Sequence, residues 1–283
     1  MSEPLTALHL LDRIVSNVGI PWQSQRADGF GDGIHLGSVD TVVTGIVTTF
    51  TPTMDVLKRA VASGRNTIIC RETPFYSRGE RTPVAYRNGP APAQELLDKD
   101  ATARAKRQFI DEHHLVIIRL FDNWDARKTD AQLHGLTMAI GWEKYRLGSS
   151  GDYFSLPRTT LGELARDLKT RLRAQAVRVI GDSQSAVRKA VLTHGFLLVS
   201  DVQRAMKEPG VDVLVGGEPV EWEATEYLED MVTAGMTKGA IFLGHQISEE
   251  PGSGEMAAWL KNFVTEVPVE WIAAGEPFST VAQ

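Results

Sequence analysis

The sequence predicts an α/β protein in which buried strands alternate with helices along most of the chain. Short apolar runs that are rich in β-branched residues recur, as in residues 41–47 and 66–70. Segments whose apolar residues have helical spacing lie between these runs. Proteins with this alternation usually carry their functional groups at the carboxyl ends of the strands, so we expect the functional residues there.

The first half of the chain contains a predicted β-α-β unit. A first helix is expected over residues 5–18, and the glycine-rich residues 29–33 predict a turn. The strand at 41–47 is followed by a helix that starts near Pro52 and ends at Gly64, and a second strand follows at 66–70. We expect these two strands to be parallel, with a right-handed crossover.

Later segments continue the alternation and suggest two lobes. Residues 77–100 carry Gly, Pro, Arg and Asn without a clear period and are predicted to form a lid-like surface loop. The remaining predicted helices are 101–112, 130–142, 160–174 and 221–234, and the remaining predicted strands are 115–121, 177–180, 189–192, 211–215 and 240–243. Residues 257–264 and 269–272 complete the alternation. Gly, Asp and Pro at 149–157 suggest a boundary, with an N-terminal lobe of 1–150 and a C-terminal lobe of 151–283.

Composition excludes several classes of partner. The net charge of -6 argues against a nucleic-acid backbone as the main partner. No apolar run approaches the roughly 20 residues of a membrane span. Cys70 is the single cysteine, so no intrachain disulfide or thiolate cluster is expected, and a reducing cytoplasm is the expected location. A small polar molecule is the expected partner.

The most informative stretch surrounds His245. An apolar run at 239–243 predicts a buried strand, and Gly244 lets the chain turn as that strand ends. His245 follows at the strand end, and Glu249 comes four residues later. An imidazole and a carboxylate at this spacing can hold a divalent metal or share a proton. The alternative is a strand-end histidine that is bonded to its neighbours.

Four predicted strand ends deliver ionisable or aromatic side chains, and we expect them to converge on one pocket. They are Arg71, Glu72 and Tyr76; Asp122, Trp124 and Asp125; Glu218 and Trp222; and His245 and Glu249. Because so many carboxylates repel one another, either some of them stay protonated with raised pKa values, or a cation or Arg71 neutralises them. One histidine with two or three carboxylates suits Zn, Mn or Fe in the divalent state, with a position open for water.

Other candidate residues have simpler interpretations. His113 and His114 precede a strand, which places them at the end opposite to the predicted pocket. His194, directly before Gly195, is predicted to be a packing or surface residue. Cys70 ends a buried strand and is predicted to belong to the core.

Four segments resemble those of the NIF three-like proteins, which are usually described as dinuclear metal-centre proteins. The segments are 44–50, 64–69, 177–182 and 244–252, and they occur in the same order as in that family. Further residues resemble a subgroup that has a Glu where other members have a His. These residues are Glu72, Phe75, Tyr76, Asp122, Trp124 and 221–223. The resemblance implies a two-lobed fold of mixed sheets flanked by helices. It also implies two metals in the cleft between the lobes and a homo-oligomer, commonly a hexameric ring.

The sequence departs from the metal-binding pattern that the resemblance implies. The C-terminal pair is retained as His245 and Glu249, and the middle Asp corresponds to Asp125. Arg71 and Glu72 replace an adjacent His pair, and Phe121 replaces a third His. A guanidinium cannot donate a lone pair to a metal. Two interpretations therefore stay open: one metal held by some of Glu72, Asp125, His245 and Glu249, or a metal-free site in which Arg71 takes the place of a cation.

The expected function is that of a metal-dependent hydrolase, amidohydrolase-like or cyclohydrolase-like, which acts on a small polar substrate. Asp122, Glu218 and His245 are the candidate catalytic residues. Arg71, Tyr76, Trp124 and Trp222 are the candidate substrate-binding residues. The alternatives are a metal-free acid–base enzyme in the same pocket and a non-enzymatic scaffold that binds a ligand or a metal.

Overall fold

The chain divides into two compact units. The structure, a computed structural model, describes residues 3–23, 31–76, 99–148 and 152–280. Unit 1 consists of residues 1–131 and 253–274, and unit 2 consists of residues 132–252 and 275–283. The sequence predicts lobes of 1–150 and 151–283. In the structure, residues 132–150 belong to unit 2 and residues 253–274 belong to unit 1.

Unit 1 contains a mixed sheet of five strands among the described residues, in the order β1-β4-β3-β2-β12. Its strands are β1 (Gly33–Leu36), β2 (Ile46–Thr49), β3 (Thr67–Cys70), β4 (Val116–Arg119) and β12 (Val269–Trp271). The strands β2, β3, β4 and β12 form a parallel series, and β1 pairs antiparallel with β4. The parallel β2–β3 pair, which α2 connects, confirms the predicted β-α-β unit.

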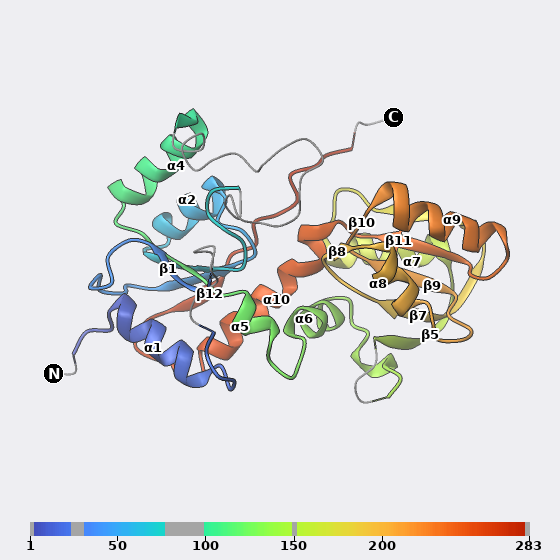
Figure 1. Cartoon of the computed structure of the whole chain (residues 1–283), viewed down its shortest axis with the longest axis horizontal. Coiled ribbons are helices and arrows are strands. Elements are labelled where there is room, and N and C mark those ends of the chain that lie inside the picture. The colour runs from blue at the N-terminus through green and yellow to red at the C-terminus, as the bar shows by residue number, and fades with distance from the viewer. Residues whose placement is uncertain (1–2, 24–30, 77–98, 149–151, 281–283) are drawn as a thin grey trace. The chain divides into compact units, whose positions relative to one another are not determined.

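Helices cover both faces of the unit 1 sheet. The helices are α1 (Ala7–Asn17), α2 (Met54–Ala62), α4 (Ala101–Glu112), the short α5 (Asp122–Asp125) and the C-terminal part of α10 (His245–Leu260). Apolar residues of α1 and α10 pack on one face, and those of α2 and α4 pack on the other. Figure 1 shows α2 and α4 on the side of the sheet opposite α1. Burial of two apolar faces between helices stabilises this three-layer unit.

The described residues of unit 2 repeat the three-layer plan around a second five-stranded sheet, in the order β5-β7-β9-β11-β6. Its strands are β5 (Tyr153–Thr160), β6 (Arg178–Ile180), β7 (Ala186–Leu192), β9 (Val213–Gly216) and β11 (Gly239–Phe242). The central strands β7, β9 and β11 are parallel, and the edge strands β5 and β6 are antiparallel to their neighbours. Two further short strands, β8 (Phe196–Leu197) and β10 (Glu218–Pro219), pair in parallel beyond the ends of β7 and β9.

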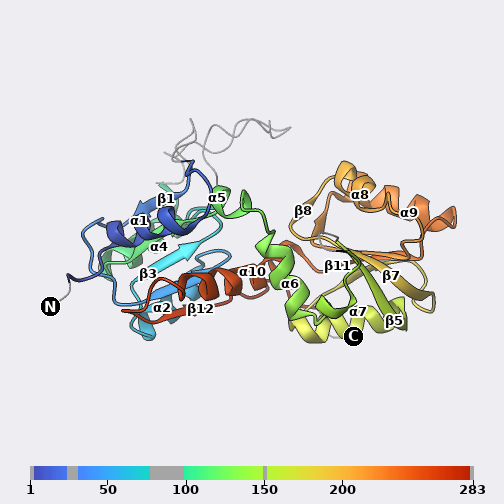
Figure 2. The same ribbon diagram turned by 90° about the horizontal axis from the view of Figure 1, so that it is seen from below.

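The helices of unit 2 also lie on both faces of its sheet. They are α6 (Ala131–Ala139), the 3₁₀ turn η1 (Glu143–Tyr145), α7 (Leu161–Leu172), α8 (Val199–Ala205), the π-helical turn η2 (Glu221–Thr225) and α9 (Glu226–Thr233). Apolar residues of α6 and α7 pack on one face, and those of α8 and α9 pack on the other. Figure 2 shows α7 on the side of the sheet opposite α8 and α9.

Two glycines allow α6 and α10 to pack closely in unit 2. A Cβ atom on Gly135 of α6 would lie 2.6 Å from the Pro251 carbonyl oxygen of α10. A Cβ atom on Gly252 would lie 1.5 Å from Oε1 of Gln132. Because real Cβ atoms do not approach neighbours so closely, glycine is required at both positions. The contact fixes the helix segment that begins with His245.

The structure corrects several sequence-based predictions. The predicted strand at 41–47 begins only at Ile46, and the predicted helix at 221–234 begins with the π-helical turn η2. Residues 153–160, partly assigned to a boundary because of Pro157, form β5 instead. Proline is tolerated there because β5 is an edge strand. His245 does not enter a turn but starts α10, so Glu249 follows one helical turn later. Most of the predicted lid at 77–100 and the start of the glycine cluster at 29–33 lie outside the described residues.

We predict that Gly135→Ala destabilises the protein, although Gly→Ala inside a helix ordinarily stabilises by about 1 kcal/mol. The added methyl group would clash with the backbone of Pro251. Thermal unfolding should therefore show a lower Tm. The matched control is Gly254→Ala in α10, where the nearest neighbour is the 43% exposed Trp271 ring, which can move. A Tm for Gly135→Ala at or above that of the wild type would contradict the close packing.

Candidate functional site

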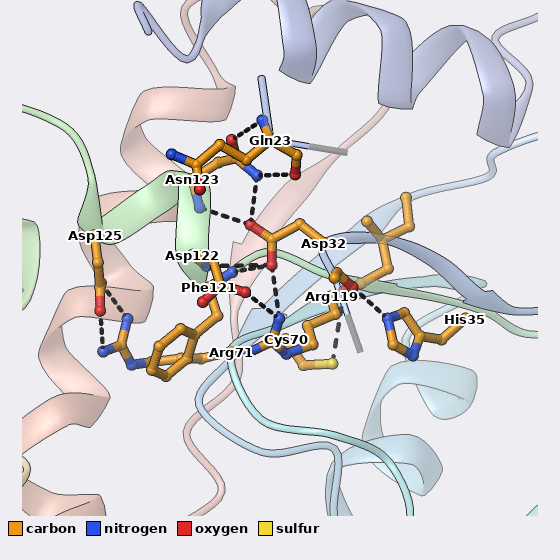
Figure 3. A network of polar contacts seen from close by, with 12 residues as sticks. Gln23, Asp32, His35, Cys70, Arg71, Arg119, Phe121, Asp122, Asn123 and Asp125 are labelled. Atoms are coloured by element: carbon orange, nitrogen blue, oxygen red, sulfur yellow. Dashed lines mark hydrogen bonds and ion pairs between the residues drawn. The ribbon is translucent and has the colours of Figure 1, made fainter. Parts of the chain in front are cut away.

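The carboxyl end of the unit 1 sheet carries a buried polar network, drawn in Figure 3. Asp32, directly before β1, accepts hydrogen bonds through both of its oxygens. Oδ1 accepts from Arg119 and from the backbone N–H groups of Phe121 and Asp122, and Oδ2 accepts from the backbone and side chain of Asn123. The side chains of Asp32 and Arg119 are 0% and 1% exposed. A buried charge pair of this kind requires such saturation, and it fixes the turn between β4 and α5.

That turn places Asp125 against Arg71, which follows β3. The Arg71 guanidinium donates two hydrogen bonds to the two oxygens of Asp125, at 2.5 and 2.7 Å. It also stacks on Phe121, with its carbon 3.9 Å from the ring centre. Only 4% of the Arg71 side chain is exposed, against 39% of Asp125. This bidentate geometry is the strong form of an ion pair.

The other candidates in unit 1 have different surroundings. Asp122 accepts from Arg119 at 2.9 Å and is 17% exposed. Glu72 is half-buried, and its N–H donates to the carbonyl of Phe50. Trp124 is 1% exposed and packs edge-on against Trp259 in the core, so its ring offers little surface to a substrate.

Tyr76 is 63% exposed and adopts a left-handed backbone conformation, with φ of 63°. Its ring centre lies 5.1 Å from the Lys106 amine of α4. This lysine is 3% exposed and donates to the Pro74 carbonyl at 2.5 Å. Burial lowers the pKa of Lys106 to about 8, and burial raises the pKa of the nearby Cys70 thiol to about 12. Cys70 is thus an inert core residue, as predicted.

In unit 2, three neighbouring parallel strands bring ionisable side chains to one edge of the sheet. His194 follows β7, Glu218 follows β9, and His245 follows β11. Because the carboxyl ends of parallel strands meet at the same edge, the three side chains lie close together. Glu249 joins them from the next turn of α10.

These four residues form a continuous chain of contacts, which we call the His–Glu cluster: Glu218, His245, Glu249 and His194. Nδ1 of His245 lies 3.2 Å from a Glu218 oxygen, and Nε2 lies 3.9 Å from Oε1 of Glu249. The same Glu249 oxygen is 3.1 Å from Nδ1 of His194. The side chain of Glu249 is 5% exposed, whereas those of His245 and Glu218 are 33% and 50% exposed. The cluster therefore runs from a buried carboxylate to the surface.

The backbone at Gly195 makes room for this cluster. Gly195 has φ of 66°, and a Cβ atom there would lie 2.4 Å from Oε1 of Glu249. Its N–H donates to the Ser248 hydroxyl, which in turn donates to the carbonyl of His245. Its own carbonyl accepts from the N–H of Glu218. A single glycine thus links the three segments that carry the cluster.

The predicted site residues fall into two groups. Unit 1 brings Arg71 to Asp125, and unit 2 brings His245 to Glu218 and Glu249. Trp222, on η2, is 65% exposed. The single pocket that was predicted to unite the two groups stays a prediction, as do the roles assigned to its residues.

Sequence reasoning missed His194, Asp32 and Lys106. His194 follows the apolar run 190–192 at a strand end, so the rule that selected His245 also applied to it. Asp32 was assigned to a glycine turn, and no sequence pattern marks its partners, which are 87 to 91 residues away. The spacing of apolar residues in α4 does not reveal that Lys106 is buried.

A family model described as Duf34/NIF3 (NGG1p interacting factor 3) matches residues 17–276. The chain belongs to the Duf34/NIF3 family. This confirms the resemblance noted in the sequence. A comparison with curated proteins gave no match. None of the described helices is long and apolar enough to cross a membrane.

Solved structures show that the chain has the NIF3 fold. It is similar to the Staphylococcus aureus hypothetical protein SA1388, with 17% identity, a TM-score of 0.70 and coverage of 99% of this chain and 100% of that one. A Bacillus cereus protein related to NIF3 gives 14% identity, a TM-score of 0.69 and coverage of 99% and 100%. Reduced HcgD from Methanocaldococcus jannaschii gives 13% identity, a TM-score of 0.60 and coverage of 95% and 99%.

Proteins of the NIF3 family typically bind metals. In unit 1, both oxygens of Asp125 accept from Arg71, whose guanidinium has no lone pair to offer. Across the described ranges, no group of three or more His, Cys, Asp or Glu side chains is arranged to hold a metal ion.

We predict that Asp32→Ala lowers the free energy of unfolding by about 3 kcal/mol, because it removes the fully buried one of the two ion-pair partners of Arg119 and the acceptor of three backbone N–H groups. Urea denaturation measures this change. The control is Asp55→Ala, which breaks an exposed ion pair with Arg59 and should have little effect. Equal effects of the two substitutions would show that the buried network does not stabilise unit 1.

We predict that Lys106→Met stabilises the protein most at neutral pH. The pKa of Lys106 is lowered from 10.5 to about 8 in the folded state, so below pH 8 the fold bears the cost of a buried charge. Between pH 8 and 10.5 the unfolded chain binds more protons, and wild-type stability rises relative to the variant. The advantage of Lys106→Met should shrink by on the order of 3 kcal/mol between pH 7 and pH 10.5.

Urea denaturation of both proteins at the two pH values measures this difference, and the comparison cancels the titration of the other groups. The matched control is Lys144→Met, which removes an exposed lysine. It measures what the loss of a lysine side chain from the surface does at the same two pH values. A pH-independent difference between the wild type and Lys106→Met would mean that the Lys106 amine is charged in the folded protein throughout this range.

Proposed function

We propose that this NIF3 family member is an enzyme that hydrolyses a small polar substrate by metal-free acid–base catalysis, with His245 as the proton carrier. The contact between His245 and Glu218 carries the proposal, together with the approach of Glu249 on the other side of the ring. An imidazole between two carboxylates is a common arrangement for a general base, because the carboxylates orient the ring and stabilise its charged form.

The contact with Glu218 selects one tautomer of His245. An ionised carboxylate only accepts hydrogen bonds, so the ring nitrogen that faces it, Nδ1, carries a proton. In the neutral ring, Nε2 then holds the lone pair. This nitrogen is the base, and the ring is 33% exposed, within reach of a solvent molecule or a substrate.

Hydrolysis proceeds by two proton transfers at Nε2. The base takes a proton from water while the water oxygen forms a bond to the electrophilic carbon of an ester or amide. The imidazolium then returns the proton to the leaving group as the carbon–oxygen or carbon–nitrogen bond breaks. Glu249, 3.9 Å from Nε2, stabilises the positive charge between the two transfers.

Unit 1 supports the metal-free form over the metal-dependent hydrolase that the sequence first suggested. Arg71 holds Asp125 through both oxygens and already supplies a fixed positive charge. We propose that Arg71 neutralises the charge of the Asp125 carboxylate. Asp122 pairs with Arg119, so its proposed catalytic role has less support than that of Glu218. The exposed ring of Trp222, which belongs to the same unit as His245, keeps its proposed role in substrate binding, and the role of Tyr76 stays a prediction.

The proposal is tested with p-nitrophenyl acetate and with the corresponding anilide as probes, on protein purified without chelators. The wild type should turn over at least one probe and retain its rate in EDTA, with a metal content near zero. His245→Gln should lower kcat by about 100-fold or more, and Glu249→Gln by about 10-fold. The control is His9→Gln, on the exposed face of α1.

Two results would contradict this function. A metal content near one per chain that is lost in His245→Gln would return the protein to the metal-dependent class. Equal probe turnover in the wild type and in His245→Gln would instead favour a non-enzymatic scaffold.

A further inference from the structure

Unit 2 contains a surface cavity away from the His–Glu cluster. Its volume is about 540 Å³, and it lies between the edge strand β5, the helix α7 and the turn η1 (Figure 2). The lining residue Thr159 pairs with Val187 near the start of β7, whereas His194 follows the end of that strand. The cavity is therefore separate from the residues of the proposed hydrolysis. Sites for small organic molecules typically have volumes of roughly 300 to 1,000 Å³, and this cavity lies within that range.

The buried part of the cavity wall is apolar. Ile140, Trp142, Leu156 and Leu164 line it and are between 1% and 7% exposed. All four belong to one apolar core, in which the ring centre of Trp142 lies 5.3 Å from that of Phe154. Because such a core is closely packed, this part of the wall is a preformed surface on which a flat apolar or aromatic group can be buried.

The exposed part of the wall carries charges of both signs. Three cations and two carboxylates line it, namely Lys144, Arg158, Arg171, Glu163 and Asp167. Both carboxylates are engaged within the protein. Asp167 accepts from Nε of Arg171 at 2.7 Å, and Glu163 accepts from the N–H of Thr160 at 2.9 Å in the capping box of α7.

Lys144 and Arg158 are the cations that these carboxylates do not hold. Within the described ranges, neither side chain forms an ion pair, and the Lys144 amine lies over the Tyr145 ring, 5.0 Å from its centre. With three cations against two carboxylates, the lining residues have a net charge of +1, whereas the whole chain has a net charge of -6. A locally positive wall in an acidic protein favours an anionic ligand.

We propose that this cavity binds a small organic anion in which a flat apolar or aromatic body is joined to a carboxylate or phosphate group. The body packs on the apolar wall beside Trp142, and the anionic group pairs with Arg158 and Lys144. A guanidinium presents parallel N–H donors that match the oxygens of either group, and an ammonium adds a second positive charge. This binding site does not depend on the proposed hydrolysis.

Isothermal titration calorimetry of the full chain tests the proposal with 2-naphthoate and 2-naphthyl phosphate. At least one of the two should bind with one molecule per chain, and the tighter one identifies the preferred anionic group. Two probes each lack one half of the proposed ligand: 2-naphthylmethanol has the rings without the charge, and acetate has the charge without the rings. Both should bind at least about 10-fold more weakly, because each loses one of the two kinds of contact.

The variant Arg158→Gln should weaken the binding of the naphthyl anion by about 10-fold, because it removes a charge-assisted pair and keeps a polar side chain. The matched control is Arg188→Gln, which removes an exposed arginine from the neighbouring strand β7, outside the cavity wall. Its affinity should stay within about 2-fold of the wild type. Both arginines are exposed, so both variants should keep the wild-type Tm. His245→Gln should bind the anion as the wild type does.

Three results would overturn the proposal. The first is the absence of binding of either naphthyl anion at millimolar concentration, including the case in which a second copy of the chain covers the cavity. The second is an equal affinity for the anion and for 2-naphthylmethanol. The third is binding that Arg158→Gln and Arg188→Gln change equally, or that is lost in His245→Gln and kept in Arg158→Gln, since the anion would then lie elsewhere on the protein.

Discussion

The His–Glu cluster depends on one backbone position, Gly195, where the chain leaves β7. Its left-handed conformation turns its N–H toward Ser248 and its carbonyl toward the N–H of Glu218. The missing side chain leaves the space that Glu249 fills. Any larger residue would be strained in this conformation and would also displace the carboxylate. A single steric constraint thus brings together groups from three separate segments of unit 2.

In unit 1, the residues at the carboxyl end of the sheet are held by the buried carboxylate of Asp32. Asp32 accepts from Arg119 and from three consecutive backbone N–H groups, which sets the start of α5. Asp125 ends that helix and meets Arg71. The result is a cation held where the family resemblance implies metal ligands. Since a guanidinium is always charged, this part of the protein keeps its positive charge without any bound ion.

Both units place polar residues at the carboxyl ends of parallel strands, but the residue types differ between the units. In each, parallel strands end at one edge, and the residues just beyond them are polar. Unit 1 pairs its groups into a neutral arginine–carboxylate contact, whereas unit 2 keeps two imidazoles beside two carboxylates. Imidazoles as a class change charge near neutral pH and a guanidinium does not, which is why the proposed proton transfer involves unit 2.

The sequence by itself determined the α/β class, the β2–α2–β3 unit, helix 101–112 and the family, because periodicity and motif order are properties of the chain that need no tertiary contact. Only the tertiary structure decided that Arg71 holds Asp125, that Asp32 pairs with Arg119, and that His194 meets Glu249. These partners are 54 to 87 residues apart, and no local pattern records which strand ends become neighbours. The order of the strands in each sheet determines which strand ends become neighbours, and a few glycines allow the segments to come close. Both are properties of the folded chain and not of a short stretch of sequence.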